Sequence, residues 1–163
     1  LMLVLCENQI GVCNGVQKTS NLCVGGAWVT CATSEYASSS AAYETSEVTC
    51  DTQDNDCDGI ADEDGACSPP AAPTITGSTP LSPSNNNTPT LVGTSDEATI
   101  VRFYASNNCQ GAPVAVSDPV SGGFFGQPVP VGLNTITVIT AKATSVGGVV
   151  STCSSSFTYM HIP

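Results

Sequence analysis

The sequence predicts a mainly β protein in two parts, a small disulfide-rich domain over residues 1–67 and an antiparallel β-sandwich over residues 73–163. Seven of the nine cysteines and eleven of the fourteen acidic residues precede residue 68. Residues 68–72 open the run "SPPAAP", whose prolines favour an extended linker. Beyond this linker, β-branched residues recur with period two, which is the pattern of half-buried strands.

The second part is expected to hold about seven short strands, as in an antiparallel sandwich. Gly, Pro, Asn and Ser separate its strand-like runs, and no window in it has helical periodicity. Cys109 follows one run and Cys153 precedes the last, so these two cysteines could bridge neighbouring loops, or a strand and a loop. The runs are 74–78, 88–94, 99–106, 113–117, 134–144 and 155–162.

The first part has few apolar runs, so its core must be small and stabilised by disulfides. The stretch "GVCNGVQKTSNLCVGGAWVTC" predicts a hairpin with Gly25-Gly26 as its turn and Trp28 on the returning strand. As the largest apolar residue of this part, Trp28 is expected in the core rather than at a ligand. Residues 36–49 are compatible with a short helix or a loop.

Charge and cysteine content narrow the class of protein. Three basic residues and a net charge of −11 argue against nucleic acid and anionic membrane surfaces as partners. Nine cysteines predict an oxidising compartment, outside the cell or on its surface. The seven in the first part leave one that is free or paired with a cysteine outside the chain; the connectivity cannot be read from spacing.

No stretch reaches the ~20 apolar residues that span a bilayer, so membrane insertion is not expected. The initial "LMLVL" is too short, and lacks the preceding basic residues, to be a complete signal peptide. An export signal is therefore expected upstream or already removed. Asn86 lies in a glycosylation sequon, Asn-Asn-Thr, whose use the sequence leaves open.

The acidic run "DTQDNDCDGIADED", residues 51–64, holds seven carboxylates and predicts a calcium loop. Alternate carboxylates can converge on one ion, a glycine permits the turn, and the next residue offers its carbonyl. An EF-hand would place Glu at the twelfth position, but Gly65 is there, so Glu63 is expected to close the shell instead. The predicted ligands are Asp54, Asp56, Asp58, Ile60 through its carbonyl, Asp62 directly or through water, and Glu63.

Ligand chemistry favours Ca²⁺ at this loop. Oxygen ligands in a flexible segment suit calcium, whereas zinc and copper prefer imidazole or thiolate. The sole histidine, His161, lies in the other part of the chain. A solvated acidic loop is the alternative, but carboxylates about 5 Å apart repel by roughly 1 kcal/mol in water and by more near a protein surface.

The stretch "YETSEVTCDTQDNDCDGIADED", preceded by "GVCNG…C…G.W..C", resembles the MopE-type metal-binding repeat of secreted proteins from myxobacteria and related bacteria. The resemblance is specific over 44–63 and looser over 6–31. It implies Asp54, Asp56, Asp58 and Glu63 as ligands. This sequence has Thr52-Gln53 where the repeat pattern prefers Gly before D-N-D. Copper chemistry would need histidines, which this part lacks.

The second part resembles the bacterial Ig-like repeats of large surface and adhesion proteins. The shared features are "TPTLVGT" before an acidic turn, "VRFY", a Cys after Asn, "GLNTITV" and a late Cys. The resemblance covers most of 73–163. It implies a spacer or docking domain without an active site.

An enzyme is not expected, because His161 is far from the acidic run in sequence and the paired carboxylates lie inside the cation loop. Two structural roles remain. One is a subunit of a filament or other polymer, a homo-oligomer in which the apolar strand Leu1–Leu5 completes a neighbour's sheet. The other is an adhesion or spacer module, in which Leu1–Leu5 is a strand of its own domain.

Overall fold

The computed structural model describes residues 4–96 and 99–163. The protein is mainly β, with all its sheet pairs antiparallel and four disulfides. It divides into two compact units, an N-terminal unit (Leu1–Cys67) and a C-terminal unit (Ser68–Pro163), so residues 68–72 belong with the second unit. No helix in the described ranges has the length and apolar character needed to cross a membrane.

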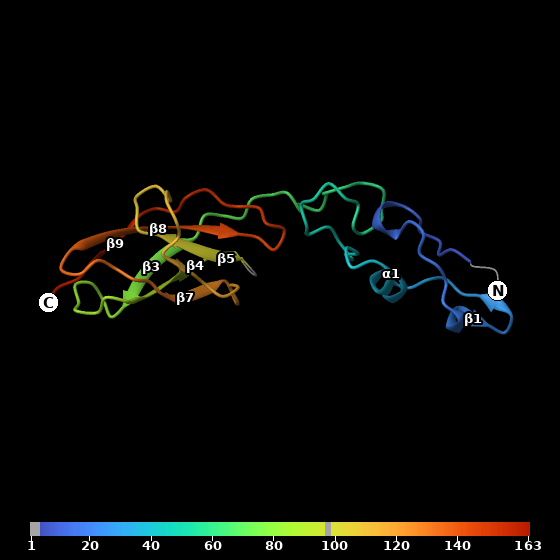
Figure 1. Ribbon diagram of the computed structural model, residues 1–163, viewed down its shortest axis with the longest axis horizontal. Coiled ribbons are helices and arrows are strands. Elements are labelled where there is room, and N and C mark those ends of the chain that lie inside the picture. The colour runs from blue at the N-terminus through green and yellow to red at the C-terminus, as the bar shows by residue number, and fades with distance from the viewer. Residues whose placement is uncertain (1–3, 97–98) are drawn as a thin grey trace. The chain divides into compact units, whose positions relative to one another are not determined.

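The N-terminal unit has little regular structure. It contains the 3-10 turns η1 (Gly11–Cys13) and η2 (Ser20–Leu22), the strands β1 (Cys23–Val24) and β2 (Ala27–Trp28), and the helix α1 (Thr33–Ser39) (Figure 1). The hairpin prediction is confirmed: β1 pairs with β2 around Gly25 and Gly26, whose φ angles of 62° and 83° suit glycine. Of residues 36–49, the first four belong to α1 and the rest form turns and loops.

Disulfides form much of the core of this unit. The pairs are Cys6–Cys31, Cys13–Cys57 and Cys50–Cys67, and Cys23 is free and exposed. The prediction that Trp28 lies in this core is wrong, because Trp28 is only partly buried on a two-residue strand. Tyr36 takes that place from α1. Its ring stacks on Tyr43 at 5.7 Å and its hydroxyl accepts the Asn8 N–H at 3.1 Å. The buried core residues are Cys6, Cys13, Val16, Tyr36 and Cys57.

The strand-addition hypothesis concerns Leu1–Leu5, of which residues 1–3 lie outside the described residues. Leu5 forms an antiparallel bridge with Gln17. The Val4 carbonyl accepts the Lys18 N–H at 2.7 Å, and the Cys6 N–H donates to the Val16 carbonyl at 2.9 Å. Residues 4–6 are therefore paired within their own unit along one edge.

The C-terminal unit holds two antiparallel sheets. The first has the order β3 (Thr74–Thr79), β4 (Thr90–Thr94), β7 (Phe124–Pro128). The second has the order β6 (Ala115–Val116), β5 (Ile100–Tyr104), β8 (Ile136–Thr144), β9 (Phe157–Met160) (Figure 1). Cys109 and Cys153 form a disulfide.

Side chains from both sheets meet in one core, which makes the unit a sandwich. Phe103 of β5 and Phe125 of β7 contact each other edge to face at 5.5 Å between ring centroids. Strand β5 alternates buried and half-buried residues, as the period-two pattern predicts. The buried cluster is Leu91, Val101, Phe103, Val120, Phe125, Val129, Ile139, Ala141 and Tyr159.

Candidate metal centre

Two disulfides hold the acidic run in place. Cys50–Cys67 closes a loop around the whole run, and Cys57, in its middle, is bonded to Cys13 of the turn η1. The Asp54 carbonyl accepts the Val12 N–H at 3.0 Å, which brings η1 against the run. The clustered carboxylates therefore lie on a segment whose backbone is fixed at several points.

The first carboxylate cluster is the predicted D-x-D-x-D-G turn. Asp54, Asp56 and Asp58 each offer a carboxylate oxygen, and the three oxygens lie within 4.8 Å of one another. Asp54 shapes the turn: its two oxygens accept the N–H groups of Asp58 and Gly59, both at 3.0 Å. Gly59 has a φ of 103°, a conformation that other residues rarely adopt.

The second carboxylate cluster contains Glu47, Asp56 and Glu63, again with three oxygens within 4.8 Å of one another. It shares Asp56 with the first cluster, so the two clusters are contiguous. Glu47 comes from outside the acidic run. It reaches the run through its Oε1, which accepts the Asn55 N–H in a short hydrogen bond and the Asp56 N–H at 3.3 Å.

Several oxygens of the second cluster are buried without a hydrogen-bond partner in the described structure: Glu47 Oε2 and both carboxylate oxygens of Glu63. Glu47 as a residue is only 2 % exposed. Buried charges in proteins are normally paired or coordinated to a metal, because their desolvation is otherwise uncompensated. The second cluster therefore has the ligand capacity that a hard cation requires.

Electrostatics at Glu63 point the same way. Burial, followed by the charges of Asp58, Asp56 and Glu47, raises the pKa of the Glu63 carboxyl above its ordinary value of 4.5. Each of these neighbours is an acid, and Glu63 forms no ion pair within the part of the chain that the structure describes. Like charges this close repel each other, and they do so more strongly near a protein surface than in bulk water.

A Glu63→Gln substitution should therefore act in opposite directions with and without a cation. The pKa of Glu63 is higher in the folded protein than its ordinary value of 4.5. In the absence of a cation, the free energy of unfolding therefore falls as the pH rises from 4.5 through the raised pKa, because Glu63 ionises more readily in the unfolded chain. Glu63→Gln removes that penalty, so its unfolding midpoint in EDTA should exceed that of wild type at pH 7. The two midpoints should converge below pH 4.5, where both side chains are neutral.

In millimolar Ca²⁺ the order of the two midpoints should reverse. A thermal unfolding series over pH 4–8 measures both effects, and a variant that is less stable than wild type in EDTA at pH 7 would contradict the assignment.

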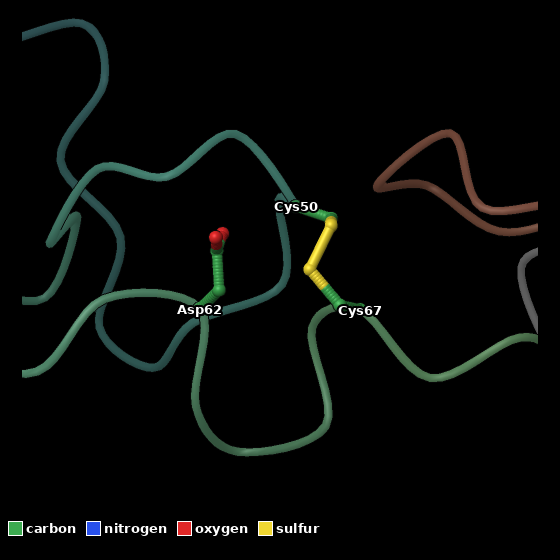
Figure 2. Close-up of side chains that lie close together, drawn as sticks. All are labelled: Cys50, Asp62 and Cys67. Atoms are coloured by element: carbon green, nitrogen blue, oxygen red, sulfur yellow. A yellow bond between two sulfur atoms is a disulfide. The ribbon is translucent and has the colours of Figure 1, made fainter.

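Asp62 was predicted as a ligand, directly or through water, and its carboxylate belongs to neither cluster. Its two oxygens accept the N–H groups of Asp51 at 2.8 Å and Thr52 at 2.9 Å. It groups instead with Cys50 and Cys67, as Figure 2 shows. Those two sulfurs are bonded to each other in a disulfide, so neither is a thiolate available to a metal (Figure 2). Asp62 thus stabilises the backbone at the start of the acidic run.

Ile60 is the remaining predicted ligand, and it would bind through its backbone carbonyl rather than its side chain. Its N–H donates to Asp58 Oδ1 at 2.9 Å and its side chain is exposed. The structure thus brings together Asp54, Asp56 and Asp58 in one cluster, and Asp56 and Glu63 in the other. Glu47 was not predicted. Its one sequence signal is an acid three residues before Cys50, a spacing that says nothing about burial.

The ligand set of both clusters consists of carboxylate oxygens alone. Oxygen-only sites select hard cations such as calcium or magnesium over zinc or copper. Acidic clusters could therefore hold a metal ion here.

Comparisons with known proteins identify no relative: no family model, no curated protein and no solved structure matches this chain. A fold alone would not identify a function, since β-sandwiches support many unrelated functions.

Proposed function

We propose that this chain is a non-enzymatic structural protein of the cell exterior, whose N-terminal unit is stabilised by a bound calcium ion together with its disulfides. One observation carries the proposal: unpartnered carboxylate oxygens converge in a unit that has only a small apolar core. A calcium ion would turn the repulsion among these acids into attraction. Binding to the folded state alone would add about 1.4 kcal/mol of stability at ten times the dissociation constant.

Calcium is the favoured cation for two reasons. The site offers carboxylates from the acidic turn and from a separate segment, which suits the six to eight ligands and variable geometry of calcium. Magnesium requires a tighter octahedron and retains its waters, so it gains less from a buried group such as Glu47. Extracellular calcium modules bind with dissociation constants of about 10⁻⁴–10⁻³ M.

The setting supports a location outside the cytosol. Four disulfides join eight of the nine cysteines, and such bonds persist in oxidising compartments. The resemblances to a MopE-type repeat and to bacterial Ig-like repeats, both found in secreted or surface proteins, support the same location.

A structural role is favoured over catalysis by the chemistry of the described groups. The buried His161 accepts the Asn134 N–H on its Nδ1 at 3.0 Å in the C-terminal unit. The clustered acids lie in the N-terminal unit and would be occupied by the cation. Acid–base or nucleophilic chemistry would need these groups in hydrogen-bond reach of a substrate.

Two uses of such a protein differ in what the N-terminal strand does. The pairing of residues 4–6 with residues 16–18 supports an adhesion or spacer module, because those backbone groups are already satisfied within the unit. A filament or polymer subunit is the second proposal. There the apolar run from Leu1 to Leu5 would add to a neighbour's sheet through its other edge.

Thermal unfolding followed by tryptophan fluorescence tests the structural role. Trp28 is the sole tryptophan, so its emission reports on the N-terminal unit alone. In 2 mM CaCl₂ we expect a higher midpoint than in EDTA, with MgCl₂ at equal ionic strength as the control. Sedimentation in the same buffers separates the two uses: calcium-dependent large assemblies favour the polymer, and a monomer throughout favours the module. Identical midpoints in calcium and EDTA would overturn the structural role.

A further inference from the structure

Glu47 is the least expected member of the acidic clusters. It lies outside the acidic run, on the segment that precedes Cys50, yet it is buried to 2 % exposure. Its Oε1 is saturated by the N–H groups of Asn55 and Asp56, whereas its Oε2 is buried without a partner. A glutamate that only held the backbone would need one carboxylate oxygen. Burying the second oxygen without a hydrogen-bond partner would cost desolvation free energy that no interaction offsets.

Among the described residues of the N-terminal unit, no basic side chain pairs with Glu47. Lys18 is the sole basic residue of the N-terminal unit, and its ammonium group donates to Glu7 and, at 2.6 Å, to the Val29 carbonyl. The groups that do face the Glu47 carboxylate are those of Asp56 and Glu63, and Glu63 also has two buried oxygens without partners. Three acids therefore converge on one point from three places in the chain.

We infer that Glu47 is a direct cation ligand, which together with Asp56 and Glu63 binds a hard divalent cation between the segment before Cys50 and the acidic run. This assignment rests on the proposed function and deepens it by adding a ligand from outside the loop. Glu47 fixes the loop backbone with one oxygen and binds the ion with the other. The ion thereby adds a second link to the hydrogen bonds from Asn55 and Asp56 that already join Glu47 to the acidic run.

The test uses Glu47→Gln in the full chain. The glutamine keeps a carbonyl oxygen to accept the Asn55 and Asp56 N–H groups, so the loop should fold, but it removes the charge and the anionic ligand. Calcium titration calorimetry should show a dissociation constant at least about tenfold weaker than that of wild type, because ligand charge sets affinity at such sites.

Glu44→Gln is the matched control. Glu44 belongs to the same segment, but its oxygens accept the N–H groups of Val48 and Thr49 and the Thr49 hydroxyl, and it belongs to neither cluster. It removes the same charge without removing a ligand. We expect its calcium affinity to stay within about twofold of wild type, since a charge that does not touch the ion is screened at physiological salt. Equal weakening by both substitutions would mean a general charge effect and would overturn the assignment.

A second readout counts water on the ion. Europium(III) occupies calcium sites, and its luminescence lifetimes in H₂O and D₂O give the number of coordinated waters. Loss of a protein ligand in Glu47→Gln should admit about one additional water, and Glu44→Gln should admit none. If wild type binds calcium but Glu47→Gln matches it in affinity and hydration, the Glu47 assignment is wrong while the proposed function stands. If wild type binds no calcium, the proposed function itself fails.

Discussion

Removing the Cys13–Cys57 disulfide is expected to unfold the N-terminal unit while leaving the C-terminal unit folded. The two cysteines are 44 residues apart, so the bond lowers the entropy of the unfolded chain by an amount worth about 4 kcal/mol. A domain of this size has a core that seldom supplies more than about 3–5 kcal/mol. Both cysteines are nearly fully buried, and replacing them would also leave a void in the core.

The C-terminal unit provides a matched control for this experiment. Cys109 and Cys153 are also 44 residues apart, so the entropic term is the same, but their unit has a core drawn from two sheets. We expect Cys109→Ala/Cys153→Ala to lower the midpoint of its unit without unfolding it at 25 °C. Both double variants belong in a Cys23→Ser background, which prevents exchange with the free thiol. Trp28 emission and the dispersion of amide signals report on the two units, and a folded N-terminal unit without Cys13–Cys57 would contradict the expectation.

Gly11→Ala is expected to disrupt both the fold of the N-terminal unit and its cation site. Gly11 has a φ of 52°, and a Cβ built on it would lie 2.1 Å from the Asp54 carbonyl oxygen and 2.6 Å from its Cγ. The left-handed conformation costs an alanine about 1–2 kcal/mol, and the clash adds roughly 1–3 kcal/mol. Relief of the clash must shift the turn η1 away from Asp54 or displace Asp54 itself, which carries the turn of the acidic loop through Asp58 and Gly59.

Gly15→Ala separates backbone strain from this contact. Gly15 also has a positive φ, 85°, but a Cβ there would meet nothing within 4 Å. We expect Gly15→Ala to lower stability by about 1–2 kcal/mol with unchanged calcium affinity, because only the conformational cost applies. Gly11→Ala should lower stability by roughly twice as much or more and should also weaken calcium binding. Equal effects of the two substitutions on stability and affinity would show that the Gly11–Asp54 contact does not matter.

The fold was predictable where local chemistry determines it. A pair of glycines between short β-prone runs specifies a hairpin, and the period-two runs of the second part correspond to β3, β4, β5, β6, β8 and β9. Strand β7 was missed, because "FFGQP" contains a glycine and a proline that weaken any strand pattern. Its conformation depends on pairing with β4, where Leu91 lies opposite Gln127. That pairing is a tertiary contact and has no local signal.

The site divides in the same way. The convergence of Asp54, Asp56 and Asp58 follows from their spacing around Gly59, so sequence reasoning could place them together. Asp62 has the right spacing too, but tertiary structure directs its carboxylate to the N–H groups of Asp51 and Thr52. Glu47 could not be predicted, because its burial depends on hydrogen bonds to Asn55 and Asp56, eight and nine residues away. The sequence likewise predicted Trp28 in the core on account of its size, whereas tertiary packing places Tyr36 of α1 there.

The central claim, that the carboxylate clusters of the N-terminal unit bind calcium, is tested most directly by isothermal titration of the EDTA-treated, oxidised protein. At pH 7 and physiological salt we predict about one Ca²⁺ per chain with a dissociation constant at or below about 10⁻³ M, and much weaker binding of Mg²⁺. Asp56 is common to both clusters, so Asp56→Asn should abolish most of the calcium binding. Absence of saturable calcium binding by wild type at about 10 mM, or full binding by Asp56→Asn, would contradict the claim.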